Sequence, residues 1–138
     1  MKKLGLDLGN KTLGIAISDE LGILARGLET FRFADKDFLV ALEFTLKLVS
    51  DNNIDVVVLG LPKNMDGTLG SQAQTSIDFK EEIAKKSNVE VVFWDERLTS
   101  KMASNMMISQ NLKRKKRKND IDKMAAIIIL QGYLDSIK

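Results

Sequence analysis

Apolar residues alternate with other residues along the first third of the chain, as they do in strands that bury one face. Three leucines fall on one face of the first such strand: Leu4, Leu6 and Leu8. Residues 9–12 have the composition of a turn, residues 13–17 continue as a second strand, and residues 23–33 make a third. This pattern predicts an antiparallel meander of three strands.

Farther along the chain, the spacing of the apolar residues lengthens to three and four, which is the period of a helix. Asp35 can cap this helix. Five apolar residues follow it: Phe38, Leu39, Leu42, Leu46 and Val49. The unbroken apolar run 56–59 instead predicts a strand that is buried on both faces. Pro62 ends that strand and opens a loop over residues 63–68.

Helix and strand signals continue to alternate after this loop. Ser71 and Gln74 form a capping-box pair, which predicts a helix that ends near residue 86. Residues 89–94 make another predicted strand, and Thr99 can cap a further helix.

A last helix is expected to begin at Asn119 or Asp120 and to run through Ile137, because its apolar stretch is long for a strand. A meander followed by alternating strands and helices predicts an α/β protein with a mixed five-stranded sheet flanked by helices. Three strands would be antiparallel and two parallel, and the crossovers between parallel strands would be right-handed.

The composition narrows the fold and the chemistry. Of the 138 residues, 44% are hydrophobic and 29% are charged, which fits a single globular domain over residues 1–138. The chain has no cysteine and no histidine, which excludes disulfides, Ser-His-Asp triads and zinc sites built from these residues. Catalysis would have to use carboxylates, amines, hydroxyls, backbone dipoles or an oxygen-ligated metal.

Two features of the sequence bear on location. No apolar segment follows the N-terminal Met-Lys-Lys, so no signal peptide is predicted. The longest apolar run, residues 124–130, is too short for a bilayer span. We therefore expect a cytoplasmic protein without a membrane partner.

The net charge of +2 conceals a local cluster of positive charge. Six basic residues are consecutive: Lys113, Arg114, Lys115, Lys116, Arg117 and Lys118. Without them the formal net charge would be −4, since 15 basic residues would face 19 acidic ones. Such a run is typical either of a solvated loop or of a contact with a polyanion.

Asp7 is the acidic residue with the most unusual setting. It lies in the middle of a predicted strand between Gly5 and Gly9, and burying an unpaired carboxylate is expensive. A metal ion or a basic partner would offset that cost, and the glycines would let a phosphate backbone come close. The structural alternative is a carboxylate that accepts hydrogen bonds from nearby backbone N–H groups or pairs with Lys11.

Two further segments supply acids. Asp95 and Glu96 close the last predicted strand, where adjacent side chains point to opposite faces, so one of them is expected on the side of Asp7. Asp120 and Asp122 begin the last helix, where the helix dipole favours acids without any function. Three acids from separate segments would make an oxygen-only site suited to Mg²⁺ or Mn²⁺ and to phosphodiester hydrolysis. The pattern alone does not choose within either pair of acids.

Four motifs in the sequence resemble, in order, those of the bacterial YqgF-like family. They are GLDLGNKTLGIAISD at residues 5–19, GLPKNMDGT at 60–68, WDERLTS at 94–100 and IDKMAAIIILQGYL at 121–134. Together they span nearly the whole chain, which makes the resemblance specific. Members of this family are described as Holliday-junction resolvases or pre-16S rRNA nucleases.

The resemblance implies a ribonuclease H-like fold, which agrees with the predicted mixed sheet. It also implies a nuclease that processes the 5′ end of pre-16S rRNA in ribosome biogenesis. The implied partners are nucleic acid, either a structured rRNA precursor or branched DNA, and the small ribosomal subunit.

The resemblance also assigns roles to residues. It implies three catalytic, metal-binding acids: Asp7, Glu96 and Asp122. The resemblance therefore favours Glu96 over Asp95 and Asp122 over Asp120. The implied contacts to the nucleic-acid backbone are Lys11, Arg97 and the basic run of residues 113–118. The chain departs from the family pattern at Asn10, where many members carry Thr, and at Asp120, where close relatives are often apolar.

Two other functions remain open at this point. Resolution of four-way DNA junctions needs paired cuts on opposing strands and predicts a symmetric homodimer, whereas the other functions allow a monomer. A non-catalytic RNA-binding assembly factor would bind RNA through residues 113–118 even after loss of the three acids.

Overall fold

The structure is a computed structural model that describes residues 1–63, 66–95 and 114–137, and for residues 114–122 it describes the helical backbone alone. The elements are β1 (Lys2–Leu8), β2 (Thr12–Ser18), β3 (Ala25–Arg32), α1 (Phe38–Asp51), β4 (Ile54–Leu61), α2 (Ser71–Lys86), β5 (Glu90–Asp95) and α4 (Arg114–Ser136). The predicted helix after Thr99 lies outside the described residues. None of the helices in the described part of the chain is long and apolar enough to cross a membrane.

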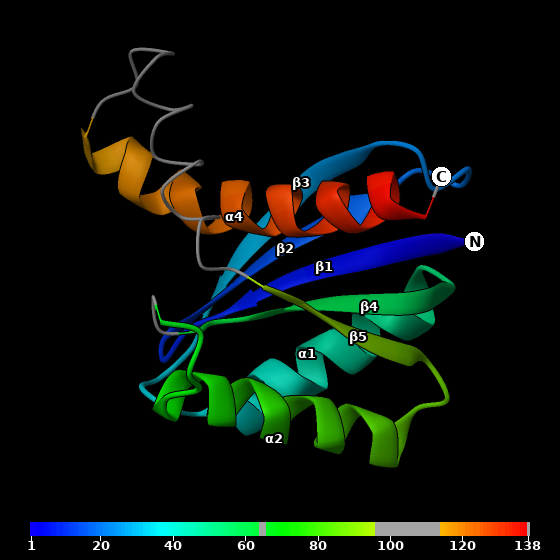
Figure 1. Cartoon of the computed structure of the whole chain (residues 1–138). Helices are drawn as coiled ribbons and strands as arrows, with labels where there is room; N and C mark the ends of the chain where they lie inside the picture. The colour runs from blue at the N-terminus through cyan, green and yellow to red at the C-terminus, as the bar shows by residue number, and fades with distance from the viewer. Residues whose placement is uncertain (64–65, 96–113, 138) are drawn as a thin grey trace.

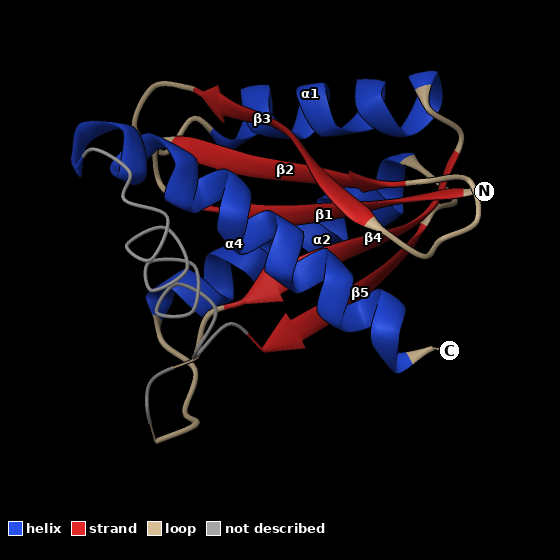
Figure 2. Cartoon of the chain, turned by 90° about the horizontal axis from the view of Figure 1, so that it is seen from above, coloured by secondary structure: helices blue, strands red, loops and turns tan. Residues whose placement is uncertain are grey.

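The five strands form one mixed sheet in the order β3-β2-β1-β4-β5. The first three strands pair antiparallel as a meander, while β4 pairs parallel with β1 and β5 pairs parallel with β4. Helices α1 and α2 cover one face of this sheet and α4 covers the other (Figures 1 and 2). The predicted arrangement of three antiparallel strands and two parallel ones is confirmed.

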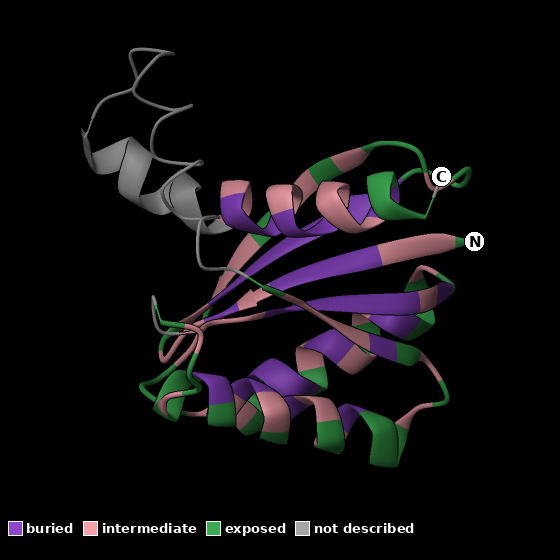
Figure 3. Ribbon diagram, in the orientation of Figure 1, coloured by how far each residue is buried: buried purple, intermediate pink, exposed green. Residues whose placement is uncertain are grey.

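The alternation along β1 divides the protein into two apolar layers. The three leucines predicted to share a face are buried in the core beneath α1 and α2, together with Phe79 and Ile83 of α2. The opposite layer joins Ala16, Val56 and Val58 of the sheet to the apolar face of α4. Figure 3 shows the buried residues concentrated in the sheet and on the helix surfaces that face it. Each fully buried leucine stabilises the fold by about 1.5–3 kcal/mol.

Helix α4 approaches the sheet closely at Gly5. A Cβ added at Gly5 would lie 2.7 Å from Leu130 Cβ and 2.9 Å from the backbone oxygen of Ala126. The prediction that Gly5 leaves this face open to a phosphate backbone is therefore wrong, because the helix occupies that space. Ala125 and Ala126 are fully buried, so small helix residues complete the close contact.

Neither of the first two helices begins where its sequence signal indicates: α1 begins later and α2 begins one residue earlier. Asp37, not Asp35, precedes the first residue of α1, and its side chain makes no capping hydrogen bond. Gly70 precedes α2, so Ser71 is the first helical residue and the predicted capping box does not form. Instead, the Gln74 side chain donates to Asp78 one turn later. A side chain caps the start of a helix only from the residue that directly precedes the first helical turn. Local composition does not determine which residue that is.

The last helix begins earlier than predicted. Helix α4 starts at Arg114, so residues 114–118 form its first turns and are not part of a loop ahead of Asn119 or Asp120. Lysine and arginine are good helix formers, and their propensity outweighs the modest repulsion from the positive end of the helix dipole. Residues 114–118 of the basic run therefore belong to the helix that continues directly over the sheet.

We expect Gly5→Ala to lower the free energy of unfolding by about 1–3 kcal/mol, because the added methyl meets the backbone of α4 and not a flexible side-chain end. Urea denaturation followed by circular dichroism measures the change. Gly9→Ala is the matched control, since its Cβ would be 3.4 Å from Thr12 Oγ1, an ordinary contact. Equal stability of the two variants would contradict the close approach of α4.

Candidate functional site

Asp7 lies near the carboxyl end of β1 and is half-buried. Its neighbours Leu6 and Leu8 pack beneath α1 and α2, so Asp7 points to the face that α4 covers. Asp7 pairs with Gly14 of β2, and Gly60 follows the residue of β4 that pairs with Leu6. The strand positions on both sides of Asp7 are therefore glycines, which place no side chain beside it.

Helix α4 crosses the sheet with its N-terminal turns toward the carboxyl end of β1. Gln131 accepts a hydrogen bond from Ala25 N at the start of β3. Lys123, two turns earlier in α4, lies against Gly27 farther along the same strand. Since β3 runs in the same direction as β1, this order places the beginning of α4 on the side of Asp7.

The backbone position of Asp122 follows from the contact at Gly5. Residue 122 lies one helical turn, about 6 Å, before Ala126, whose backbone oxygen faces Gly5. Asp7 lies two residues, about 7 Å, beyond Gly5 along the strand. The structure thus brings α4 at residue 122 to the part of the sheet that carries Asp7. The side chains of Asp120 and Asp122 lie outside what the structure describes.

Asp95 lies on the other side of the sheet. In the alternation of β5, Phe93 packs into the core beneath α1 and α2, and Asp95 points the same way. Its Oδ2 lies 4.0 Å from Lys63 Nζ. The structure therefore separates Asp95 from Asp7, while Glu96 lies outside the described residues.

The turn between β1 and β2 is tied to two neighbouring segments through Asn10. Its side-chain Oδ1 accepts a hydrogen bond of 3.1 Å from Gln72 Nε2 in the first turn of α2. Its backbone oxygen accepts a hydrogen bond of 2.7 Å from Lys36 N, and Lys11 O accepts one of 3.0 Å from Phe33 N. These bonds fix the turn that carries the exposed Lys11. Gln72 and Lys36 were not found from the sequence, although the departure from Thr at position 10 marked this turn.

The loop after β4 approaches the same end of the sheet. Lys63 and Leu69 form an isolated β-bridge that closes it. Within the loop, the Thr68 hydroxyl and N–H both donate to Asp66 Oδ1, at 2.7 Å and 3.0 Å. The hydroxyl bond, followed by the backbone bond, lowers the pKa of Asp66 below its ordinary value.

The remaining predicted contacts are described only in part. Among the side chains that the structure describes, no three acidic residues lie close enough together to hold a metal ion. Asp7 is the one predicted ligand whose side chain is described. Arg97 and Lys113 lie outside the described residues, and residues 114–118 are described by their helical backbone.

Sequence comparison identifies relatives over the full length of the chain. A family model described as "RuvX: Holliday junction resolvase" matches residues 1–136. A protein of Halalkalibacterium halodurans is 50% identical over 135 residues, covering 98% of this chain and 96% of its own length. A protein of Bacillus subtilis is 50% identical over 137 residues, covering 99% of both chains. Each carries the name "Putative pre-16S rRNA nuclease".

Solved structures share the fold. The resolvase of fowlpox virus, in a complex with Holliday junction DNA, superposes with a TM-score of 0.63 at 18% identity, covering 99% of both chains. The RuvC protein of T. thermophilus with a Holliday junction superposes with a TM-score of 0.62 at 17% identity, covering 99% of this chain and 95% of that one. At such identities the likeness concerns the fold, and the predicted ribonuclease H-like architecture is confirmed. With the match over residues 1–136 and relatives at 50% identity, the chain belongs to the RuvX family of nucleases, which confirms the resemblance seen in its motifs.

Proposed function

We propose that this chain, acting as a single domain over residues 1–138, is a metal-dependent nuclease that processes the 5′ end of pre-16S rRNA. The observation that carries the proposal is the setting of Asp7, a half-buried carboxylate between two glycine positions of the sheet and beneath the N-terminal half of α4. The names of the relatives at 50% identity support the RNA substrate.

The chemistry of the donors fits Mg²⁺ or Mn²⁺. A chain without histidine or cysteine offers oxygen ligands, and carboxylates are the ligands that these hard cations prefer. We assign the ligands as Asp7, Glu96 and Asp122. When bound, the ions would supply an activated water and stabilise the leaving oxygen of the phosphodiester.

Two features of the fold support the choice of Glu96 and Asp122. Asp95 points away from Asp7, which disfavours it as a second ligand and so supports the choice of Glu96. The backbone of α4 reaches this face at residue 122, one turn before its contact with Gly5. Asp120 stands two residues away, about 200° around the helix, and would point elsewhere.

The chain's own residues would position the substrate. The backbone of Asp7 is held by β1, which pairs with β2 at Asp7 itself and with β4 as far as Leu6, so the backbone that carries the carboxylate is fixed before substrate binds. Residues 114–118 precede Asp122 by one to two turns of the same helix, about 6–12 Å, within reach of the phosphates next to the cleaved one. We propose that they bind the nucleic-acid backbone together with Lys11, Arg97 and Lys113.

A second candidate function is resolution of four-way DNA junctions. The description of the family model favours it, whereas the names of the relatives at 50% identity favour RNA. Junction resolution requires a homodimer, and rRNA processing does not. Two measurements separate these functions. Cleavage assays compare a pre-16S RNA fragment with a DNA four-way junction as substrates, and sedimentation of the protein measures its oligomeric state.

We expect Asp7→Asn to reduce cleavage of a structured pre-16S RNA fragment at least about 100-fold in Mg²⁺ or Mn²⁺. Loss of residues that only orient metal ligands costs up to about this factor, so loss of a ligand should cost no less. The variant should retain its circular dichroism spectrum and its affinity for the RNA.

Asp95→Asn is the matched control, because it makes the same change on the opposite side of the sheet. It weakens a partly exposed ion pair with Lys63 and should leave cleavage within about twofold of the parent. Full activity of Asp7→Asn, or equal losses in the two variants, would refute the assignment. RNA binding without cleavage by the parent protein would favour the assembly-factor alternative.

Replacing residues 114–118 with glutamine should weaken RNA binding and reduce the slope of log affinity against log salt by about 0.7 for each phosphate that the protein no longer neutralises. Glutamine has a helix propensity close to that of lysine, so α4 should remain intact. The same replacement of Lys85 and Lys86, at the end of α2, should leave the slope unchanged. Filter binding over a range of KCl concentrations measures the slope for both variants. An unchanged slope in the variant of residues 114–118 would exclude their contact with the nucleic-acid backbone.

A further inference from the structure

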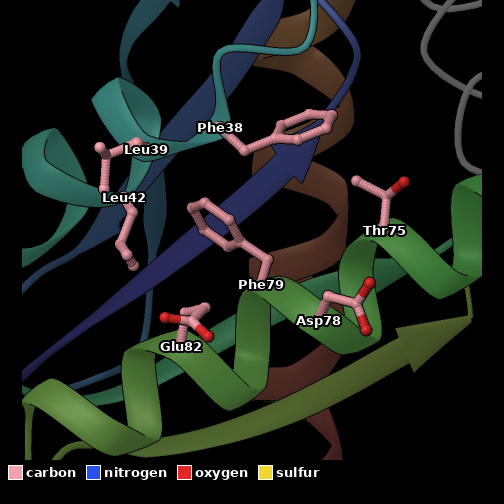
Figure 4. A pocket seen from close by; sticks show the side chains of 7 residues that line it. All are labelled: Phe38, Leu39, Leu42, Thr75, Asp78, Phe79 and Glu82. Atoms are coloured by element: carbon pink, nitrogen blue, oxygen red, sulfur yellow. The ribbon is translucent and has the colours of Figure 1, made fainter.

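A pocket lies between α1 and α2, on the side of the sheet opposite Asp7 (Figure 4). Its volume is about 280 Å³. Phe38, Leu39 and Leu42 of α1 face Phe79 of α2 across it. None of these residues belongs to the proposed nuclease site, so the pocket requires a separate explanation.

The apolar wall of the pocket is partly open to solvent. Leu42 and Phe79 are buried at its base, whereas Leu39 at the rim is 58% exposed. An exposed leucine beside an apolar cavity extends the surface on which another apolar group could be buried. The pocket and its rim together have the form of an anchoring site for a large apolar side chain.

The polar side of the rim is acidic. Asp78 and Glu82 are one helical turn apart on α2, so their carboxylates lie on the same face of the helix. Asp78 accepts a hydrogen bond from the neutral Gln74 amide, and Glu82 forms an exposed ion pair of 3.1 Å with Lys85. Exposed ion pairs are weak, so both carboxylates remain able to attract an incoming cation.

The size and charge of the pocket restrict what can bind. Sites for small molecules and cofactors usually have volumes of about 300–1,000 Å³, so this pocket is at or below the lower limit of that range. Its two carboxylates repel phosphate groups, which disfavours nucleotides and nucleic acid. A single apolar side chain with a positive charge beside it matches both the volume and the charge.

We propose that the pocket between α1 and α2 binds a segment of a partner protein that presents a large apolar side chain next to a lysine or arginine. The apolar side chain would fill the pocket between Phe38 and Phe79, and the basic side chain would pair with Asp78 or Glu82. A partner bound there leaves the α4 side of the sheet accessible. The proposal does not depend on the nuclease assignment.

The test uses four matched peptides, acetylated and amidated: Lys-Phe-Lys, Gln-Phe-Gln, Glu-Phe-Glu and Lys-Ala-Lys. Amide chemical shifts of the ¹⁵N-labelled protein report where each peptide binds and how tightly. We expect Lys-Phe-Lys to shift the amides of α1 and α2 around the pocket, and Gln-Phe-Gln to bind about threefold more weakly. Glu-Phe-Glu and Lys-Ala-Lys should produce no saturable shifts.

Three variants locate the binding. Asp78→Asn combined with Glu82→Gln should abolish the preference for Lys-Phe-Lys over Gln-Phe-Gln, and Glu81→Gln, an exposed position on the same helix outside the pocket, should preserve it. Thr75→Trp should fill the pocket and prevent binding of every peptide. Because the double variant changes only surface groups, the test holds even if the tryptophan variant folds poorly. Equal binding of the lysine and glutamate peptides, shifts elsewhere, or no binding at all would overturn the proposal.

Discussion

The close contact between α4 and the centre of the sheet is the constraint on which the candidate site depends. Gly5 on β1 admits the helix backbone at Ala126, and Gly132 on α4 admits the ring of Trp94, which a Cβ there would approach to 2.7 Å. The glycines lie on different elements, so neither the strand nor the helix alone sets the depth of packing. That depth determines how near a helix-borne carboxylate can come to the carboxylate of Asp7.

Polar contacts keep the helix from sliding along this apolar interface. The Gln131 side chain accepts from Ala25 N at 2.8 Å and donates to Ile23 O at 2.9 Å, so it reproduces the pairing of a neighbouring strand at the start of β3. Apolar contacts alone tolerate small shifts of a helix, whereas a pair of directional hydrogen bonds permits one position. The alignment of α4 with β1 is therefore fixed at the end of the helix that lies away from Asp7.

The sequence predicts the sheet better than it predicts the helix ends. Alternation with a period of two is a local property, and it correctly assigns Leu4, Leu6 and Leu8 to one face and Asp7 to the other. The capping signals at Asp35 and Ser71 fail because several polar residues near a helix start can serve as caps and tertiary packing selects among them. Similarly, nothing local shows that the free space beside Gly5 is taken by a helix more than 100 residues later in the chain. At the site, Asp95 can be set apart from its neighbour only when it is known which face of β5 meets the core. That face is determined by packing with α1 and α2.

Trp94 is the single tryptophan of the chain, and it lies where β5 meets Gly132 of α4, one residue before Asp95. The emission of an indole ring depends on the polarity of its surroundings and on the groups that touch it. This side chain is consequently an intrinsic fluorophore at the contact between β5 and α4. Any event that changes the packing of β5 against α4 can therefore be followed by tryptophan fluorescence in the unlabelled protein.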